Sequence, residues 1–205
     1  MKVTKYPQSC LVVEGDGRRL LIDPGVITMN AFSLDDFGAV DAVLYTHQHP
    51  DHYDENQVDE LLDRGATLYG NADVCDKIGG DRASEVTDGE TFEVAGFEIA
   101  PRDLPHVEMV DGSPGPPNTG YVIDGMLFHP GDGAEIEGLR VTNLALPIAG
   151  PSISFRTAYR FTESLGAELV IPIHYDLFTA NPELFEGFCD VAKVVILGHG
   201  DSVDL

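Results

Sequence analysis

The chain has little of three features that mark particular classes of protein: basic residues, cysteine and long apolar runs. Only 12 of its 205 residues are lysine or arginine, against 35 aspartates and glutamates, and the formal net charge is −23. Nucleic-acid binding requires a basic surface, so nucleic acid is not an expected partner. Cys10, Cys75 and Cys189 lie far apart with no Cys-x-x-Cys pair. Their spacing argues against a disulfide framework or a thiolate zinc site and fits a reducing cytoplasm.

Membrane and secretory signals are missing as well. No apolar stretch approaches the roughly 20 residues of a membrane span, and residues 1–7 lack the apolar run of a signal peptide. We therefore expect a cytoplasmic protein without a membrane partner. At 205 residues, with 43% hydrophobic residues, we expect a single domain over 1–205 with a sizeable core. The sequence is compatible with either a monomer or a homo-oligomer.

The stretch 46–52 contains the motif His47-x-His49-x-Asp51-His52, in which four residues can bind a metal. It follows a predicted buried strand and precedes a predicted helix over 54–64. Side chains two apart on an extended strand end point to the same side, so His47 and His49 suit one ion. Asp51 and His52, where the chain turns into the helix, suit a second. Imidazoles beside a carboxylate are costly to bury unpaired, so the cluster predicts a site for two divalent ions.

The remaining pattern predicts one organisation used twice: hairpins followed by strand–helix–strand. It predicts an α/β (α+β) fold, a four-layer αββα sandwich of two mixed β-sheets. Asp23 lies in the turn Asp23-Pro24-Gly25. It could be a partner of a metal-bound histidine or merely a turn residue, and we favour the turn residue. The expected strands are 2–6, 10–14, 18–22, 41–45, 67–69, 121–123, 126–128, 141–146, 169–173 and 194–197, with shorter hairpin strands in 85–101. The expected helices are 54–64, 72–78, 155–165 and 182–192.

Two ions need more ligands than the first cluster supplies. Three further candidates follow predicted strands: His106 after the hairpins, Asp132 after the hairpin strand 126–128, and His174 after the strand 169–173. A three-histidine site with an open position suits a hydrolytic zinc, and a carboxylate can bridge two ions.

These motifs resemble the metallo-β-lactamase superfamily in order and approximate spacing over nearly the whole chain. The motifs are His47-x-His49-x-Asp51-His52, an isolated His106, Gly131-Asp132 and Pro172-Ile173-His174. The resemblance implies a metallo-β-lactamase-like fold, with a first metal on the residues His47, His49 and His106. It implies a second metal on Asp51, His52 and His174, with Asp132 bridging both. The short chain and its Pro-Ile-His-Tyr stretch are most similar to small hydrolases around the L-ascorbate-6-phosphate lactonase branch.

The expected function is metal-dependent hydrolysis of a small-molecule ester, lactone or phosphate-bearing substrate. Two divalent ions, Zn²⁺ or else Mn²⁺ or Fe²⁺, would hold the attacking hydroxide, and Asp51 would orient it. His129 could donate a proton or contact substrate, or equally could be a strand-end residue bonded to a backbone carbonyl. Arg156 and Tyr175 are candidate substrate contacts, and His199 is expected to be structural. Alternatives are a phosphodiesterase or nuclease, a non-catalytic metal-binding module, and iron-dependent oxygen chemistry.

Overall fold

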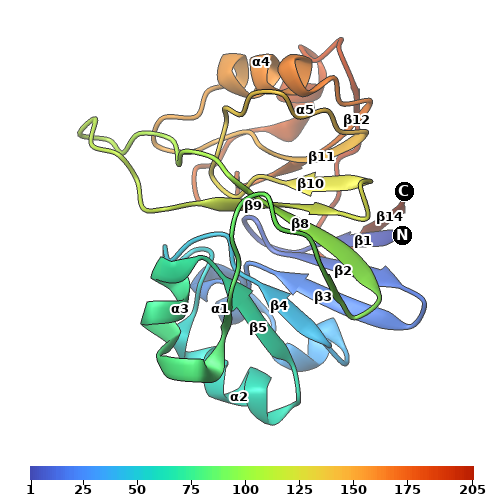
Figure 1. The fold of residues 1–205 in the computed structure, drawn as a ribbon. Helices are drawn as coiled ribbons and strands as arrows, with labels where there is room; N and C mark the ends of the chain where they lie inside the picture. The colour runs from blue at the N-terminus through green and yellow to red at the C-terminus, as the bar shows by residue number, and fades with distance from the viewer.

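Two seven-stranded mixed sheets pack face to face in the computed structural model, which describes residues 1–205 (Figure 1). The first sheet has the strand order β14-β1-β2-β3-β4-β5-β6 and the second has the order β13-β12-β11-β10-β9-β8-β7. The first sheet consists of β1 (Lys2–Lys5), β2 (Leu11–Gly15), β3 (Arg18–Ile22), β4 (Ala42–Leu44), β5 (Thr67–Gly70), β6 (Ser84–Glu85) and β14 (Ser202–Asp204). The second consists of β7 (Phe92–Val94), β8 (Phe97–Asp103), β9 (Thr119–Ile123), β10 (Leu127–His129), β11 (Asn143–Pro147), β12 (Leu169–Ile173) and β13 (Lys193–Val194).

Helices cover the outer face of each sheet. The α-helices are α1 (Val26–Ala31), α2 (Val58–Asp63), α3 (Ala72–Ile78), α4 (Phe155–Leu165) and α5 (Pro182–Glu186). Three short 3₁₀-helices are η1 (Leu34–Phe37), η2 (Glu55–Gln57) and η3 (Gly80–Arg82). In Figure 1, α1, α2 and α3 lie outside the first sheet, and α4 and α5 lie outside the second. The predicted αββα sandwich is therefore confirmed.

Strand alternation produces the layers. Successive side chains of a strand point to opposite faces. Leu20 and Ile22 of β3 accordingly enter the core between the sheets, while Leu21 enters the core beneath the first sheet's helices. In β12, Ile171 faces the central core and Val170 faces the core under α4. Three apolar clusters, one between the sheets and one under each helical layer, hold the four layers together.

Parallel pairing brings the ligand-bearing loops to one end of the sandwich. Strands β3 to β6 are parallel neighbours, and so are β10 to β13. The carboxyl ends of parallel strands meet at the same edge of a sheet, where sites form in folds of this kind. The loops after β4, β10 and β12, together with the loop after β8, supply all seven predicted ligands.

Several predicted elements differ from the structure. The expected helix 54–64 begins as η2, because the side chain of Asp54 accepts the main-chain N–H of Asn56 and tightens the first turn. The expected helix 182–192 ends at Glu186, before Gly187. The expected strand 194–197 shares only Val194 with the observed β13, which begins one residue earlier. The sequence missed α1, η1 and β14, the last of which pairs with β1.

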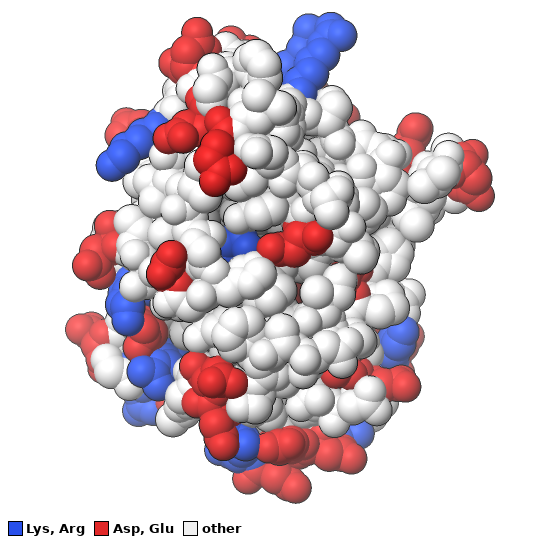
Figure 2. Space-filling view, turned by 180° about the vertical axis from the view of Figure 1, so that it is seen from behind, with Lys and Arg blue, Asp and Glu red and all other residues white.

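The surface is predominantly acidic, as the composition requires. Figure 2 shows one face on which acidic side chains lie around the edge and also near the middle, with basic side chains scattered among them. No helix in the chain has the length and apolar character needed to traverse a bilayer.

Candidate metal centre

The seven predicted ligands converge between the two sheets. His47, His49, Asp51 and His52 come from the loop after β4, which belongs to the first sheet. His106, Asp132 and His174 come from the ends of β8, β10 and β12 in the second sheet. They form two adjacent groups, and within each group the candidate ligand atoms lie within 4.8 Å of one another. The structure thus brings together all seven residues that the sequence predicted.

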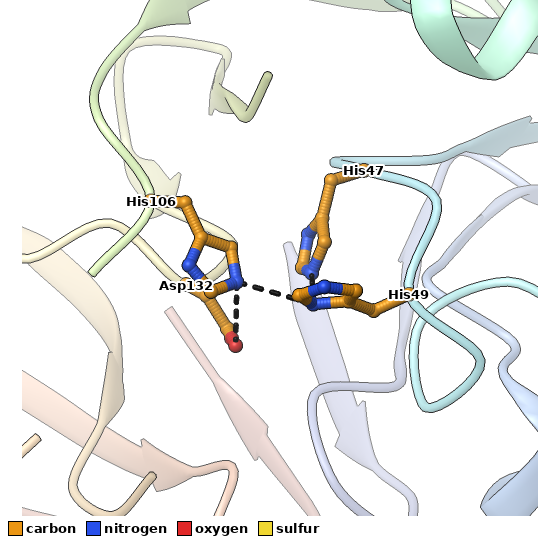
Figure 3. A group of neighbouring side chains, drawn as sticks. All are labelled: His47, His49, His106 and Asp132. Carbon is orange, nitrogen blue, oxygen red and sulfur yellow. Dashed lines mark hydrogen bonds and ion pairs between the residues drawn. The ribbon is translucent and has the colours of Figure 1, made fainter. Parts of the chain in front are cut away.

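The first cluster consists of His47, His49, His106 and Asp132, with their ring nitrogens and carboxylate turned toward one another (Figure 3). His49 Nδ1 lies 3.1 Å from His47 Nε2 and 3.2 Å from His106 Nε2. His106 Nε2 lies 3.5 Å from Asp132 Oδ2. All members except the half-buried His49 are buried, so solvent reaches this cluster at His49.

The second cluster consists of Asp51, His52 and His174. His174 Nε2 lies 3.1 Å from Asp51 Oδ2, and His52 Nε2 lies 3.9 Å from the same oxygen. Asp132 reaches this cluster too: its Oδ1 is 3.1 Å from His52 Nε2 and its Oδ2 is 3.3 Å from His174 Nε2. One buried carboxylate therefore contacts both clusters, in the position that the predicted bridging ligand requires.

The donor atoms fit two bound cations. His52 Nε2 and Asp132 Oδ1 are buried 3.1 Å apart, and neither forms a hydrogen bond of good geometry. Two such polar atoms that face each other in a native fold indicate that another partner belongs between them. In the first cluster three ring nitrogens converge, and His49 Nδ1 could donate a proton to only one of the other two. Two ligands of one tetrahedral ion at about 2.0–2.2 Å stand roughly 3.3–3.6 Å apart, close to the observed separations. Imidazole and carboxylate together suit a divalent transition metal.

Comparisons with known proteins show the family of this chain. A family model described as a β-lactamase superfamily domain matches residues 2–174. A UPF0173 metal-dependent hydrolase of Pyrococcus furiosus is 32% identical, and the match covers 100% of both chains. The chain belongs to the UPF0173 metal-dependent hydrolases of the metallo-β-lactamase superfamily.

Solved structures show the same architecture. Igni18, a novel metallo hydrolase from the hyperthermophilic archaeon Ignicoccus hospitalis, superposes with a TM-score of 0.82 at 25% identity, over 98% of this chain and 97% of its own. The metallo-β-lactamase fold protein YhfI from Bacillus subtilis has a TM-score of 0.71 at 16% identity, over 98% of each chain. The predicted superfamily and its fold are confirmed.

Asp23 orients the second cluster of this superfamily member. Its fully buried carboxylate accepts hydrogen bonds from the main-chain N–H of Thr46 (2.8 Å) and the Thr46 hydroxyl (2.7 Å), and it lies 2.7 Å from His52 Nδ1. A partner on Nδ1 directs the lone pair of Nε2 into the site. The interpretation of Asp23 as only a turn residue was therefore wrong: it ends β3 and also holds His52. The sequence Asp23-Pro24-Gly25 is typical of a turn and therefore does not indicate the contact with His52.

The other buried imidazoles of the two clusters also have a partner at Nδ1. His106 Nδ1 lies 2.6 Å from the carbonyl of Val107, and His174 Nδ1 lies 2.7 Å from the carbonyl of Ala149. The Thr46 hydroxyl lies 3.0 Å from His47 Nδ1. Each of these rings thus turns Nε2 toward the clusters, which is the arrangement that metal-ligating histidines use.

Protonation differs between the two clusters. Burial lowers the pKa of His47 well below its ordinary value, and burial also lowers the pKa of His49. Burial acts in the same direction on His52 and His174, but the carboxylate of Asp132 and further carboxylate contacts outweigh it and raise both pKa values. Burial alone would raise the pKa of Asp132, but the neighbouring imidazoles hold that pKa well below its usual range.

The remaining candidates lie outside the two clusters. His129 is fully buried: its Nε2 donates to the carbonyl of Ser9 (2.8 Å) and its Nδ1 accepts from the N–H of Gly131 (3.2 Å). Both ring nitrogens are engaged with the main chain, so the geometry favours the backbone-bonded role over a proton donor. Arg156 is exposed on α4, and the hydroxyl of Tyr175 donates to the carbonyl of Leu197. His199 Nε2 lies 2.7 Å from Asp176 Oδ1.

Proposed function

We propose that the protein hydrolyses a small-molecule ester or lactone at a centre of two divalent ions, most simply Zn²⁺. The observation that carries this proposal is the buried carboxylate of Asp132 between two complete ligand clusters. His47, His49 and His106 would hold the first ion, and Asp51, His52 and His174 the second. Two ions held in this way make water nucleophilic near neutral pH and polarise the group under attack.

Asp51 has the position to orient the attacking water. Its side chain is 18% exposed, whereas the Asp132 side chain is 5% exposed. The pKa of Asp51 is held below its usual range because contacts with His174 and His52 outweigh the effect of burial. Asp51 Oδ2 receives the protein contacts, and Oδ1 makes none of them. The ionised Oδ1 can therefore accept a hydrogen bond from a water and orient it.

The cavity beside the first cluster favours a substrate without a phosphate group. It has a volume of about 650 Å³, a common size for small-molecule sites, and His106 is the one candidate ligand among the residues that line it. Asp73, Glu85 and Asp103 contribute carboxylates to its lining, which contains no lysine or arginine. An anionic group would be repelled there, whereas a neutral or cationic group would be accommodated. The resemblance to the L-ascorbate-6-phosphate lactonase branch stays a prediction.

Metal content and hydrolysis test the proposal together. Protein purified without chelator or added metal is subjected to elemental analysis and assayed with a p-nitrophenyl ester, a γ-lactone and bis(p-nitrophenyl) phosphate. We expect two equivalents of metal and turnover of the ester or lactone, both lost in His47→Ala and Asp132→Ala. Full activity in either variant would refute the site. Preferential turnover of the phosphodiester would favour the phosphodiesterase or nuclease function, and bound metal without turnover would favour a non-catalytic module.

A further inference from the structure

Gln8 is a buried residue that forms hydrogen bonds with two members of the second cluster, Asp51 and His174. It lies in the turn between β1 and β2, is fully buried and has a φ of 57°. Its Nε2 donates to Asp51 Oδ2 (3.1 Å), and its main-chain carbonyl accepts from the N–H of His174 (2.9 Å). Its Oε1 accepts from the N–H of Leu177 (2.9 Å). Gln8 thus ties a ligand from the first sheet to a ligand from the second.

An ion pair between the buried Lys5 and the half-buried Asp176 anchors the main chain of Gln8. The N–H of Gln8 donates to Asp176 Oδ2 (2.7 Å), and the same oxygen lies 3.4 Å from Lys5 Nζ. Lys5 is itself fully buried, with its ammonium 4.6 Å from the centre of the Tyr175 ring. The other oxygen of Asp176 holds His199. Asp176 is therefore fixed from three sides, and it fixes Gln8 in turn.

The backbone of Gln8 supports a specific role. The left-handed region is unfavourable for a non-glycine residue, so this conformation persists where surrounding contacts determine it. Here four hydrogen bonds, two from the main chain and two from the side chain, set the conformation. All four partners lie on Asp51 or on residues 174–177. None lies on the first cluster.

We propose that Gln8 is a positioning residue for the second metal subsite. Its amide holds Asp51 and its carbonyl holds the main chain of His174, while Asp176 and Lys5 hold Gln8. This inference rests on the proposed two-ion centre. It predicts that loss of the Gln8 amide weakens one of the two bound ions and spares the other. Removal of partners behind metal ligands typically costs about 10–100-fold in metal affinity.

Stepwise Zn²⁺ binding to Gln8→Met tests the proposal without any substrate. Methionine is close to glutamine in length but offers no amide. Zinc affinities of the metal-free proteins are measured by competition with a chromophoric chelator. We expect one equivalent to weaken by about 10–100-fold and the other to stay within about threefold of the wild-type value. Asn143→Leu is the matched control, because Asn143 is a buried amide bonded to the carbonyl of Met126, outside the site. It should leave both equivalents unchanged.

A double variant identifies the affected subsite. In His52→Ala the second subsite is already impaired, so adding Gln8→Met should leave the affinity of the remaining equivalent unchanged. If Gln8→Met fails to fold, as judged by circular dichroism, Gln8→Glu replaces it. Glutamate keeps the size and the bond from Leu177 but sets a like charge against Asp51, and the same selective loss is expected.

Equal weakening of both equivalents, or of neither, would overturn the positioning role. That result would leave the two-ion centre standing, since the wild-type protein would still bind two equivalents. Binding of fewer than two equivalents by the wild-type protein would overturn both proposals. Two-equivalent binding with the selective loss, but without hydrolysis of any tested substrate, would support Gln8 and refute the hydrolytic assignment alone.

Discussion

The change Asp23→Asn tests how the second cluster is oriented, because it keeps the shape of the side chain and alters only hydrogen-bond polarity. Oδ1 of Asp23 accepts from the N–H of Thr46, and Oδ2 accepts from the Thr46 hydroxyl and lies beside His52 Nδ1. An amide has one acceptor oxygen and one NH₂ group. If the NH₂ takes the place of Oδ2, it faces His52 Nδ1. If it takes the place of Oδ1, it faces the N–H of Thr46. Either orientation sets a donor against a donor.

Both orientations have a cost that can be measured. An NH₂ group facing Nδ1 makes this nitrogen the acceptor and moves the ring proton of His52 to Nε2, which then cannot bind metal. Disturbing a partner of this kind costs about 10–100-fold in metal affinity, or about 1.4–2.7 kcal/mol. The alternative orientation leaves the buried N–H of Thr46 unpaired, at a cost of about 1–3 kcal/mol in the free energy of unfolding.

Two assays on one protein preparation distinguish these outcomes. Chelator competition gives the affinity of each zinc equivalent, and urea denaturation of the metal-free protein gives the free energy of unfolding. The control is Asp54→Asn, the same chemical change at a buried carboxylate that bonds Asn56 and Gln57 and touches no predicted ligand. Unchanged zinc affinity together with unchanged stability in Asp23→Asn would refute the orienting role of this carboxylate.

Two further predictions concern the protons released on zinc binding and the close packing of Gly115 against His106. The pKa values of His52 and His174 are raised and those of His47 and His49 are lowered, so zinc binding near pH 7 should release protons mainly from the second cluster. The zinc affinity of the second equivalent should therefore rise more steeply with pH than that of the first. Calorimetry in buffers of different ionisation enthalpy measures the protons released by each equivalent, and equal release by both would contradict this prediction. In the metal-free protein, protonated His52 stabilises the fold below its unfolded pKa of about 6.5, and this contribution is lost as pH rises through the raised folded value. A Cβ on Gly115 would lie 2.2 Å from His106 Nδ1, so Gly115→Ala should displace that ring and weaken the first equivalent. Gly187→Ala, with space for a Cβ at 3.6 Å from its neighbours, should not, and equal zinc affinities in both variants would refute the close approach.

Local pattern was sufficient to predict the seven residues that the structure brings together. His47, His49, Asp51 and His52 are close in sequence, and a strand before them fixes their direction. His106, Asp132 and His174 follow predicted strands, and the rule that parallel strands end at one edge brings them together. The two-sheet sandwich followed from the same alternation of strands and helices. Two expected elements extended too far, the helix 182–192 and the strand 194–197, because tertiary packing rather than propensity decides where short elements end.

The residues behind the ligands could not be found in this way, because their contacts join segments far apart in sequence. Asp23 is 29 positions from His52, and Gln8 is 43 positions from Asp51. Neither the turn Asp-Pro-Gly nor an isolated glutamine indicates a partner of a metal ligand. A carboxylate or amide gains this role only after the first sheet has placed the strands β1, β2, β3 and β4 in order.

Backbone strain marks the same residues. Seven non-glycine residues have a positive φ, and three of them, Asp16, Ala95 and Asp124, precede a glycine in a hairpin turn, where this conformation is expected. The other four are Gln8, Asp23, His174 and Thr179. The first three of these four are joined to the second cluster by hydrogen bonds or belong to it, and Thr179 lies in the segment that follows His174. Strain of this kind persists where surrounding contacts over-determine the conformation. At Gln8 the strained backbone therefore coincides with the side-chain hydrogen bond to Asp51, a candidate ligand.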